Sequence, residues 1–315
     1  MKRAYHYNEV ALVPQYNNIE SRLDPDLSTW LTKDLTIGIP ILAANMDTVI
    51  SEDLAKGLRM FDVPPIWHRF TENDMEVQRE WINSLGGYAS LGLNNTREEK
   101  IKLFRTPNIE GICIDVAHGH DRRVINLISE IKYDFPEVQV IAGNVCTPNG
   151  YIDLVSAGAD AVKVGIGPGA ACLTRDLTGA GVPQFTAVYE CGEIAKKYRV
   201  PIIADGGIKS SRDIVLALAA GASSVMIGSL FAATYESAAK GTGPGGPIAY
   251  TGQSRSNKDG IIDEGKSCYL QQTGSAKDLI NNLLGGIRSG MTYGGARTIK
   301  ELQRKAEFVI QSGVR

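Results

Sequence analysis

The stretch PIIADGGIKSSRDIVLALAAGASSVMIGS, residues 201–229, carries the structural unit that recurs through this chain. It begins and ends with short apolar runs that close in Asp, Gly or Ser. Between them, Ser210 is a candidate N-cap for an apolar helix. Continuous apolar strands joined by a helix are typical of a parallel sheet covered on both faces. The stretch therefore predicts a strand–helix–strand unit of the α/β class.

The same unit recurs along the chain. The expected strands are 39–46, 65–68, 88–93, 111–117, 138–145, 161–167, 201–207 and 223–229. Expected helices between them include 121–133 and 185–198, and Thr71 is a second N-cap candidate. Repeated units of this kind favour a closed (β/α)₈ TIM barrel. An open Rossmann sheet is the alternative, but it would show GxGxxG after its first strand, where this chain reads DTVISED.

Composition narrows the class of protein. The 315 residues are 43% hydrophobic and 22% charged, with a net charge of −2. We therefore expect one TIM-barrel domain over 1–315, with C-terminal helices and no nucleic-acid partner. The first residues lack an apolar core and the apolar runs are short, so we expect a cytoplasmic protein without a membrane partner.

Polar and glycine residues gather at the expected carboxyl ends of the strands, where barrel enzymes carry their chemistry. The last two ends read ADGG and IGS, which place Asp205, Gly206, Gly207, Gly228 and Ser229 there. Glycine pairs alone could be turns. Together with a carboxylate that can accept ribose hydroxyls, they predict a site for a sugar phosphate or nucleotide.

The loop GIGPGAACLTR, residues 165–175, places Cys172 among glycines after the sixth expected strand. A packed structural thiol is the ordinary reading of a cysteine. That reading fits Cys113 and Cys191, which fall inside an expected strand and helix, and leaves Cys146 and Cys268 open. Cys172 is instead predicted to border the cavity.

This loop and the following TGAGVPQ resemble the catalytic loop of the IMP dehydrogenase/GMP reductase family. The resemblance covers nearly the whole chain, through YNEVALVP, ANMDTV, IDVAHGH, IAGNV, IADGGI, VMIGSLFA, EGK and GGIRSGMTYGGA. It implies a nicotinamide cofactor and a cysteine, here Cys172, that attacks carbon 2 of a purine nucleotide. It also implies a homotetramer.

The resemblance also implies a role for each matching residue. The catalytic residues would be Cys172, Thr174 and Glu264. The purine nucleotide would be held by Met46, Asp205, Gly206, Gly207, Gly228, Ser229, Gly252, Gln253, Ser254 and Gly265. The cofactor would be held by Ser21, Arg22, Arg69, Asp115, Val116, Ala117, Ile166 and Gly167, although a solvated role is the alternative for the two arginines. Backbone carbonyls of Gly167, Gly169, Cys172 and Arg175 would hold a monovalent cation, normally potassium.

Two activities occur in the family, and the sequence favours the reductase. Dehydrogenases hydrolyse the covalent intermediate with an Arg-Tyr pair on a flap, and this chain contains no Arg-Tyr dipeptide. The regulatory insertion (CBS) of many dehydrogenases is also missing. EGK (264–266) resembles the reductase signature, although Ile261 stands where that pattern has arginine. Segment 241–266 is the one long stretch without a strand or helix pattern, and it is expected to be irregular and to form a mobile lid.

The resemblance therefore implies conversion of GMP to IMP and ammonia with NADPH. The first alternative is an IMP dehydrogenase without the regulatory insertion, which oxidises IMP to XMP with NAD. The second is a nucleotide sensor on the same barrel without catalysis.

Overall fold

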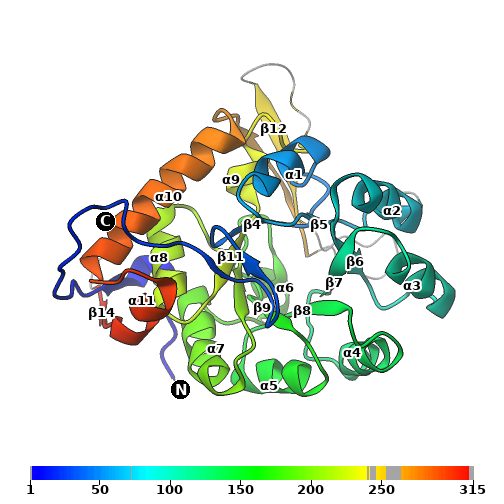
Figure 1. Cartoon of the computed structure of the whole chain (residues 1–315), viewed down its shortest axis with the longest axis horizontal. Coiled ribbons are helices and arrows are strands. Elements are labelled where there is room, and N and C mark those ends of the chain that lie inside the picture. The colour runs from blue at the N-terminus through cyan, green and yellow to red at the C-terminus, as the bar shows by residue number, and fades with distance from the viewer. Residues whose placement is uncertain (1, 72, 240, 242–245, 253–263, 312–315) are drawn as a thin grey trace.

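The computed structural model describes residues 2–71, 73–239, 241, 246–252 and 264–311. Eight parallel strands form its central sheet, and helices surround them (Figure 1). The strands are β4 (Ile41–Ala43), β5 (Ile66–Trp67), β6 (Gly87–Leu91), β7 (Ile109–Asp115), β8 (Gln139–Val145), β9 (Ala161–Val164), β10 (Ile202–Asp205) and β11 (Ser224–Ile227). Hydrogen bonds join neighbouring strands of this sheet in the order β4-β11-β10-β9-β8-β7-β6-β5. The sheet is thus a nearly closed barrel, and the predicted (β/α)₈ class and all eight expected strands are confirmed.

Helices alternate with these strands along the chain and cover the outside of the barrel (Figure 1). They are α1 (Glu52–Arg59), α2 (Asp74–Leu85), α3 (Arg97–Phe104), α4 (Arg122–Asp134), α5 (Pro148–Ser156), α7 (Gln184–Tyr198), α8 (Ser211–Ala219) and α10 (Ala276–Tyr293). Shorter helices are η1 (Tyr7–Glu9), α6 (Thr174–Thr178), α9 (Ser229–Ala232) and α11 (Ile299–Lys305). The strands are buried because helices cover one face and the barrel core fills the other; Ile202, Ile203 and Ala204 of β10 are fully buried.

Two predictions about helix starts had different outcomes. Ser210 is the N-cap of α8, and its N–H donates to the Asp213 carboxylate at 3.1 Å, as in a capping box. Thr71 does not cap α2, so that prediction was wrong. The N-cap is Asn73, which sits in the left-handed region at φ 62°. Asn tolerates that conformation, so the chain can enter the helix two residues later.

Three small antiparallel pairs lie outside the barrel sheet. They are β1 (Val10–Leu12) with β14 (Phe308–Ile310), β2 (Thr29–Trp30) with β3 (Thr36–Ile37), and β12 (Pro247–Thr251) with β13 (Ser267–Gln271). The last pair corrects the expectation that 241–266 is irregular throughout. β12 lies within that segment, and its partner β13 follows it, so the pairing could not be seen in the segment alone. Residues 242–245 and 253–263 lie outside the described residues.

Candidate active site

A pocket of about 310 Å³ opens where the carboxyl ends of the barrel strands meet the loop after β9. Its lining contains most of the predicted site residues. These are Met46, Arg69, Asp115, Val116, Ala117, Ile166, Gly167, Gly169, Cys172, Thr174, Asp205, Gly206, Gly228, Gly252, Glu264 and Gly265. The pocket therefore gathers, from many separate segments, residues that the sequence pointed to one motif at a time.

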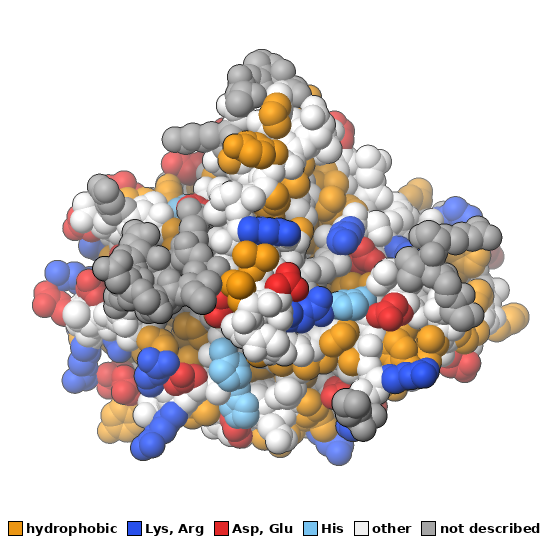
Figure 2. Space-filling model, turned by 180° about the vertical axis from the view of Figure 1, so that it is seen from behind, with side chains coloured by type: hydrophobic (Ala, Val, Ile, Leu, Met, Phe, Trp, Pro, Cys, Tyr) orange, Lys and Arg blue, Asp and Glu red, His pale blue; other side chains and the backbone are white. Residues whose placement is uncertain are grey.

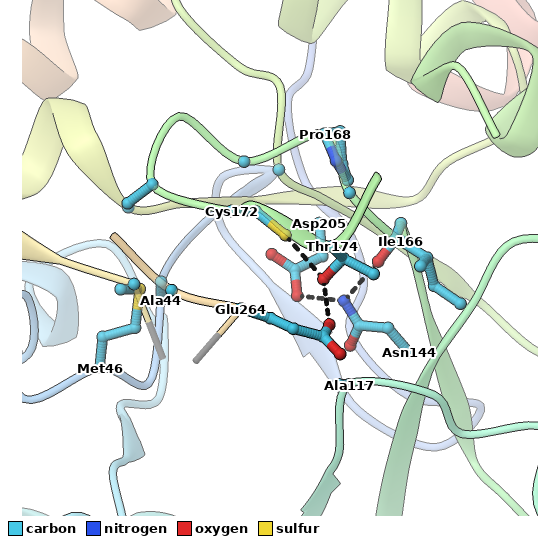
Figure 3. A pocket seen from close by; sticks show the side chains of 18 of the residues that line it. Ala44, Met46, Ala117, Asn144, Ile166, Pro168, Cys172, Thr174, Asp205 and Glu264 are labelled. Atoms are coloured by element: carbon cyan, nitrogen blue, oxygen red, sulfur yellow. Dashed lines mark hydrogen bonds between the residues drawn. The ribbon is translucent and has the colours of Figure 1, made fainter. Parts of the chain in front are cut away.

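Cys172, Thr174 and Glu264 form a connected row at one wall of the pocket (Figure 3). The Cys172 thiol donates to Thr174 Oγ1 at 3.2 Å. Thr174 Oγ1 in turn donates to Glu264 Oε2 at 2.5 Å. A thiol, a hydroxyl and a carboxylate joined in this order can pass protons between the carboxylate and a ligand atom that lies close to the sulfur.

Backbone pairing brings Glu264 to the catalytic loop from far along the chain. An isolated antiparallel bridge joins Cys172 to Gly265. On either side, Leu173 N–H donates to the Glu264 carbonyl at 2.6 Å and Lys266 N–H donates to the Ala171 carbonyl at 2.9 Å. Since these are main-chain bonds, the position of the Glu264 side chain follows from strand-like pairing between the two segments.

The other cysteines differ from Cys172 in their surroundings. Cys113 and Cys191 are fully buried, in β7 and α7, as expected for core residues. Burial raises the pKa of each of these two thiols to about 12. Burial also raises the pKa of Cys146. A protonated thiol is a poor nucleophile, and Cys172 is the one among the described cysteines that lines the pocket.

Lys163 lies below the pocket and joins its two strand-end carboxylates. Its ammonium pairs with Asp115 at the end of β7 and with Asp205 at the end of β10, the latter at 3.1 Å. Burial alone would lower the pKa of Lys163, but the two carboxylates outweigh it and raise the pKa. Lys163 is therefore a fixed cation that holds both carboxylates in place.

Asn144 adds a second support to Asp205. Its side-chain N–H₂ donates to Asp205 Oδ2 at 2.9 Å and to the Gly165 carbonyl at 2.8 Å (Figure 3). Among the described residues no group donates to Asn144 Oδ1, which is buried. This oxygen can accept a hydroxyl of a bound ligand. Asp205 and Asn144 together present the acceptors that a ribose diol requires.

The residues predicted for the cofactor divide into two groups. Arg69 lines the pocket. Its guanidinium lies 4.9 Å from the centre of the Phe70 ring, and its Nη2 donates to the Asp115 carbonyl at 3.4 Å. Its Nε is buried and has no partner among the described residues, so it remains available to an anionic or carbonyl ligand. Ser21 and Arg22 do not line the pocket; Arg22 lies over the Tyr293 ring at the end of α10. Their assignment to the cofactor stays a prediction.

On the predicted phosphate side, Gly228 leaves no room for a side chain. A Cβ on Gly228 would lie 2.4 Å from the Tyr250 hydroxyl, which itself contacts Met46 Sδ at 3.7 Å. Gly206 lines the pocket, whereas Gly207 and Ser229 do not. Gly207 follows Gly206 in a left-handed conformation at φ 78°, and Ser229 is the first residue of α9. Gln253 and Ser254 lie outside the described residues.

The loop predicted to bind a cation offers carbonyls with spare acceptor capacity. The Gly169 carbonyl accepts from Cys172 N–H at 3.1 Å and the Arg175 carbonyl accepts from Gly179 N–H at 3.0 Å. Each carbonyl has a second lone pair, so these partners leave room for a cation. The potassium site stays a prediction.

Several lining residues were missed by the sequence analysis. They are Ala44, Phe70, Asn144, Gly165, Pro168, Ala171 and Tyr250. Lys163 was missed too. The motif GNV at the end of β8 and the motif HRF after β5 marked Asn144 and Phe70 as strand-end residues. Nothing local distinguishes Lys163 from a solvated lysine.

Two negative findings apply to the described part of the chain. None of its helices is long and apolar enough to cross a membrane. No cluster of three or more His, Cys, Asp or Glu side chains suited to a metal ion was found in it. On the face seen in Figure 2, acidic and basic side chains of the described residues are interspersed, without a wide stripe of one sign.

Comparisons with known proteins agree on one family and differ on the reaction. The family model described as IMP dehydrogenase / GMP reductase domain matches residues 4–314. The inosine-5'-monophosphate dehydrogenase of Aquifex aeolicus is 44% identical over 70% of this chain, which spans 49% of that protein. The GMP reductase of Streptococcus equi subsp. equi is 36% identical over 98% of this chain and 96% of its own length. The inosine-5'-monophosphate dehydrogenase of Borreliella burgdorferi is 32% identical over 98% of this chain and 94% of its own length.

Proposed function

This chain belongs to the IMP dehydrogenase / GMP reductase domain family, so it is an oxidoreductase of purine nucleotides, and we propose that its reaction is the NADPH-dependent reductive deamination of GMP to IMP. The hydrogen bond of 2.5 Å between Thr174 and Glu264 is the observation that carries the proposal. Deamination must protonate a departing amine beside the sulfur of Cys172. A carboxyl group linked to the thiol through one hydroxyl provides a path for that proton.

The covalent step begins at Cys172. Its thiolate forms a bond to carbon 2 of guanine, and the bond from that carbon to the exocyclic nitrogen breaks. The nitrogen leaves as ammonia after it takes a proton through Thr174 from Glu264, so a thioimidate remains on the sulfur. Splitting the displacement into two steps avoids expelling a poor leaving group during hydride transfer.

When bound, NADPH supplies the hydride that reduces carbon 2. The carbon–sulfur bond then breaks, and its electron pair returns to Cys172 as the thiolate. Over the cycle GMP, NADPH and protons give IMP, NADP⁺ and ammonium, so the exocyclic nitrogen and the reducing equivalents are both accounted for. The buried, unpartnered Arg69 Nε and the wall formed by Asp115, Val116 and Ala117 are suited to hold the cofactor.

The remaining assignments belong to the same proposal. Asp205 with Asn144 would bind the ribose, and the glycines after β10 and β11 would bind the phosphate. Potassium would occupy the carbonyl loop of Gly167, Gly169, Cys172 and Arg175. A single catalytic domain over 1–315 and a cytoplasmic location stay predictions from the composition of the sequence. The homotetramer stays a prediction from the resemblance, and light scattering of the purified protein tests it.

The second candidate is IMP dehydrogenase, and it is favoured by the similarity of this chain to the dehydrogenases of Aquifex aeolicus and Borreliella burgdorferi. One absorbance assay of the reduced nicotinamide separates the candidates. NADPH consumed with GMP, together with ammonium release, supports the reductase. NADH formed with IMP, together with XMP, supports the dehydrogenase, and the absence of turnover in both directions supports a nucleotide sensor.

A further inference from the structure

The N-terminal segment contacts the catalytic loop through His6. Arg175, three residues after Cys172, directs its Nη1 to His6 Nε2 at 3.2 Å. A guanidinium has no lone pair, so the arginine donates and the imidazole nitrogen accepts. The two residues are 169 positions apart in the chain.

The backbone around His6 is held from three sides. The backbone N–H of His6 donates to Glu9 Oε2 at 2.7 Å. On one side, Tyr5 N–H donates to Thr186 Oγ1 of α7 at 2.7 Å, and on the other, Arg212 of α8 donates to the Tyr7 carbonyl at 2.9 Å. Because both flanking residues are tied to barrel helices, the backbone that carries the imidazole is fixed beside Arg175.

Arg175 connects this acceptor to the backbone of the catalytic loop. A Cβ on Gly167 would lie 2.3 Å from Arg175 Cγ, and one on Gly181 would lie 2.6 Å from the same atom. The aliphatic stem therefore passes between two glycines that both have left-handed backbone, at φ 82° and 143°. Gly167 lines the pocket, so a shift of the arginine stem would move the pocket wall beside Cys172.

We infer that His6 is a positioning residue for the catalytic loop: by accepting from Arg175 it holds the arginine stem between Gly167 and Gly181, and so holds Cys172 in place for attack. The inference rests on the proposed function only in taking Cys172 as the nucleophile. It predicts that the N-terminal segment affects the chemical step more than nucleotide binding.

The test compares three variants in the full chain. His6→Leu removes the acceptor, His6→Gln offers a carbonyl oxygen in its place, and Lys2→Leu is the control in the same segment at a side chain that is 91% exposed. We expect His6→Leu to lower kcat about tenfold or more, since small misplacements remote from the reacting atoms have effects of that size. KM for the nucleotide should change little, His6→Gln should recover much of kcat, and Lys2→Leu should match the wild type.

A second readout does not depend on the reaction. The rate at which iodoacetamide alkylates Cys172, followed by peptide mass spectrometry, reports the position of the thiol with no substrate present, and Cys146 and Cys268 are internal references. His6→Leu should change the rate at Cys172 alone. An unchanged rate and unchanged kcat overturn the inference. Equal loss in His6→Leu and His6→Gln with a lowered melting temperature also overturns it, because that result is a general folding defect. If the wild type does not turn over GMP, the alkylation result still decides the question.

Discussion

Thr174 and Glu264 are separated by 90 positions in the chain, yet Thr174 Oγ1 donates to Glu264 Oε2 at 2.5 Å. The contact depends on main-chain pairing between the catalytic loop and the segment before β13, through Leu173 and Lys266. A proton path to Cys172 thus requires the two segments to be paired.

Glu264→Gln should separate the two halves of the proposed reaction. The amide keeps the size and hydrogen bonding of the carboxylate but cannot carry a proton, so GMP deamination should fall about a hundredfold or more. Stopped-flow mixing with IMP and NADP⁺ should still give a burst of reduced cofactor and the adduct on Cys172. Equal loss in both directions would instead place Glu264 in nucleotide binding, and steady XMP release from the wild type would support the dehydrogenase.

Cys172→Ala should abolish turnover and leave GMP binding intact. The predicted ribose and phosphate contacts lie on β10, β11 and the residues after them, so calorimetry should find wild-type affinity within a few-fold. Mass spectrometry of the wild type quenched in mid-turnover should show the purine on the peptide that contains Cys172. Cys146→Ala, a half-buried thiol outside the pocket lining, is the matched control. Turnover by Cys172→Ala would disprove the covalent step.

Asp205→Ala should weaken nucleotide binding strongly. Hydrogen bonds to a charged acceptor contribute about 1.5–3 kcal/mol, which corresponds to roughly ten- to a hundredfold in KM. Titration of GMP into the Cys172→Ala background measures binding without turnover. Unchanged affinity in the double variant would remove Asp205 from the ribose site.

Lys163→Met should destabilise the barrel because it leaves Asp115 and Asp205 facing each other with no cation between them. Removing one partner of a buried ion pair costs about 3–5 kcal/mol, measured by urea unfolding. Lys196→Met is the control, since its pair with Glu193 is half exposed and contributes about 1 kcal/mol or less. A loss no larger than that of the control would show that Lys163 does not hold the two carboxylates.

The charge of Lys163 also predicts a pH dependence of stability. Its pKa is raised in the folded state, so the charged form is favoured by folding. This contribution is fully present below the ordinary lysine pKa of about 10.4 and is lost as the pH rises through the raised value. Unfolding free energies of wild type and Lys163→Met should therefore converge only at strongly alkaline pH; a difference already lost at neutral pH would contradict the assignment.

Much of this protein could be predicted from its sequence because the decisive features are local. Apolar runs that close in Gly, Asn, Asp or His marked all eight barrel strands, and the strand ends marked Asp205, Gly228 and the loop of Cys172 as neighbours of one cavity. In a parallel barrel all carboxyl ends face the same side, so finding the strand ends was enough to gather the pocket.

Only the tertiary structure decided the contacts between segments whose local patterns carry no sign of each other. Lys163 reads as an ordinary alternating residue in AVKV, but the barrel closes around it and places its ammonium between Asp115 and Asp205. β12 pairs with a strand beyond the segment thought to be irregular, and His6 meets Arg175 across the fold. The sequence alone determined the barrel and the chemistry of its strand ends, because periodicity and turn residues act over a few positions. The supports of the site act between distant positions, and burial and pairing between them exist only once the chain has folded.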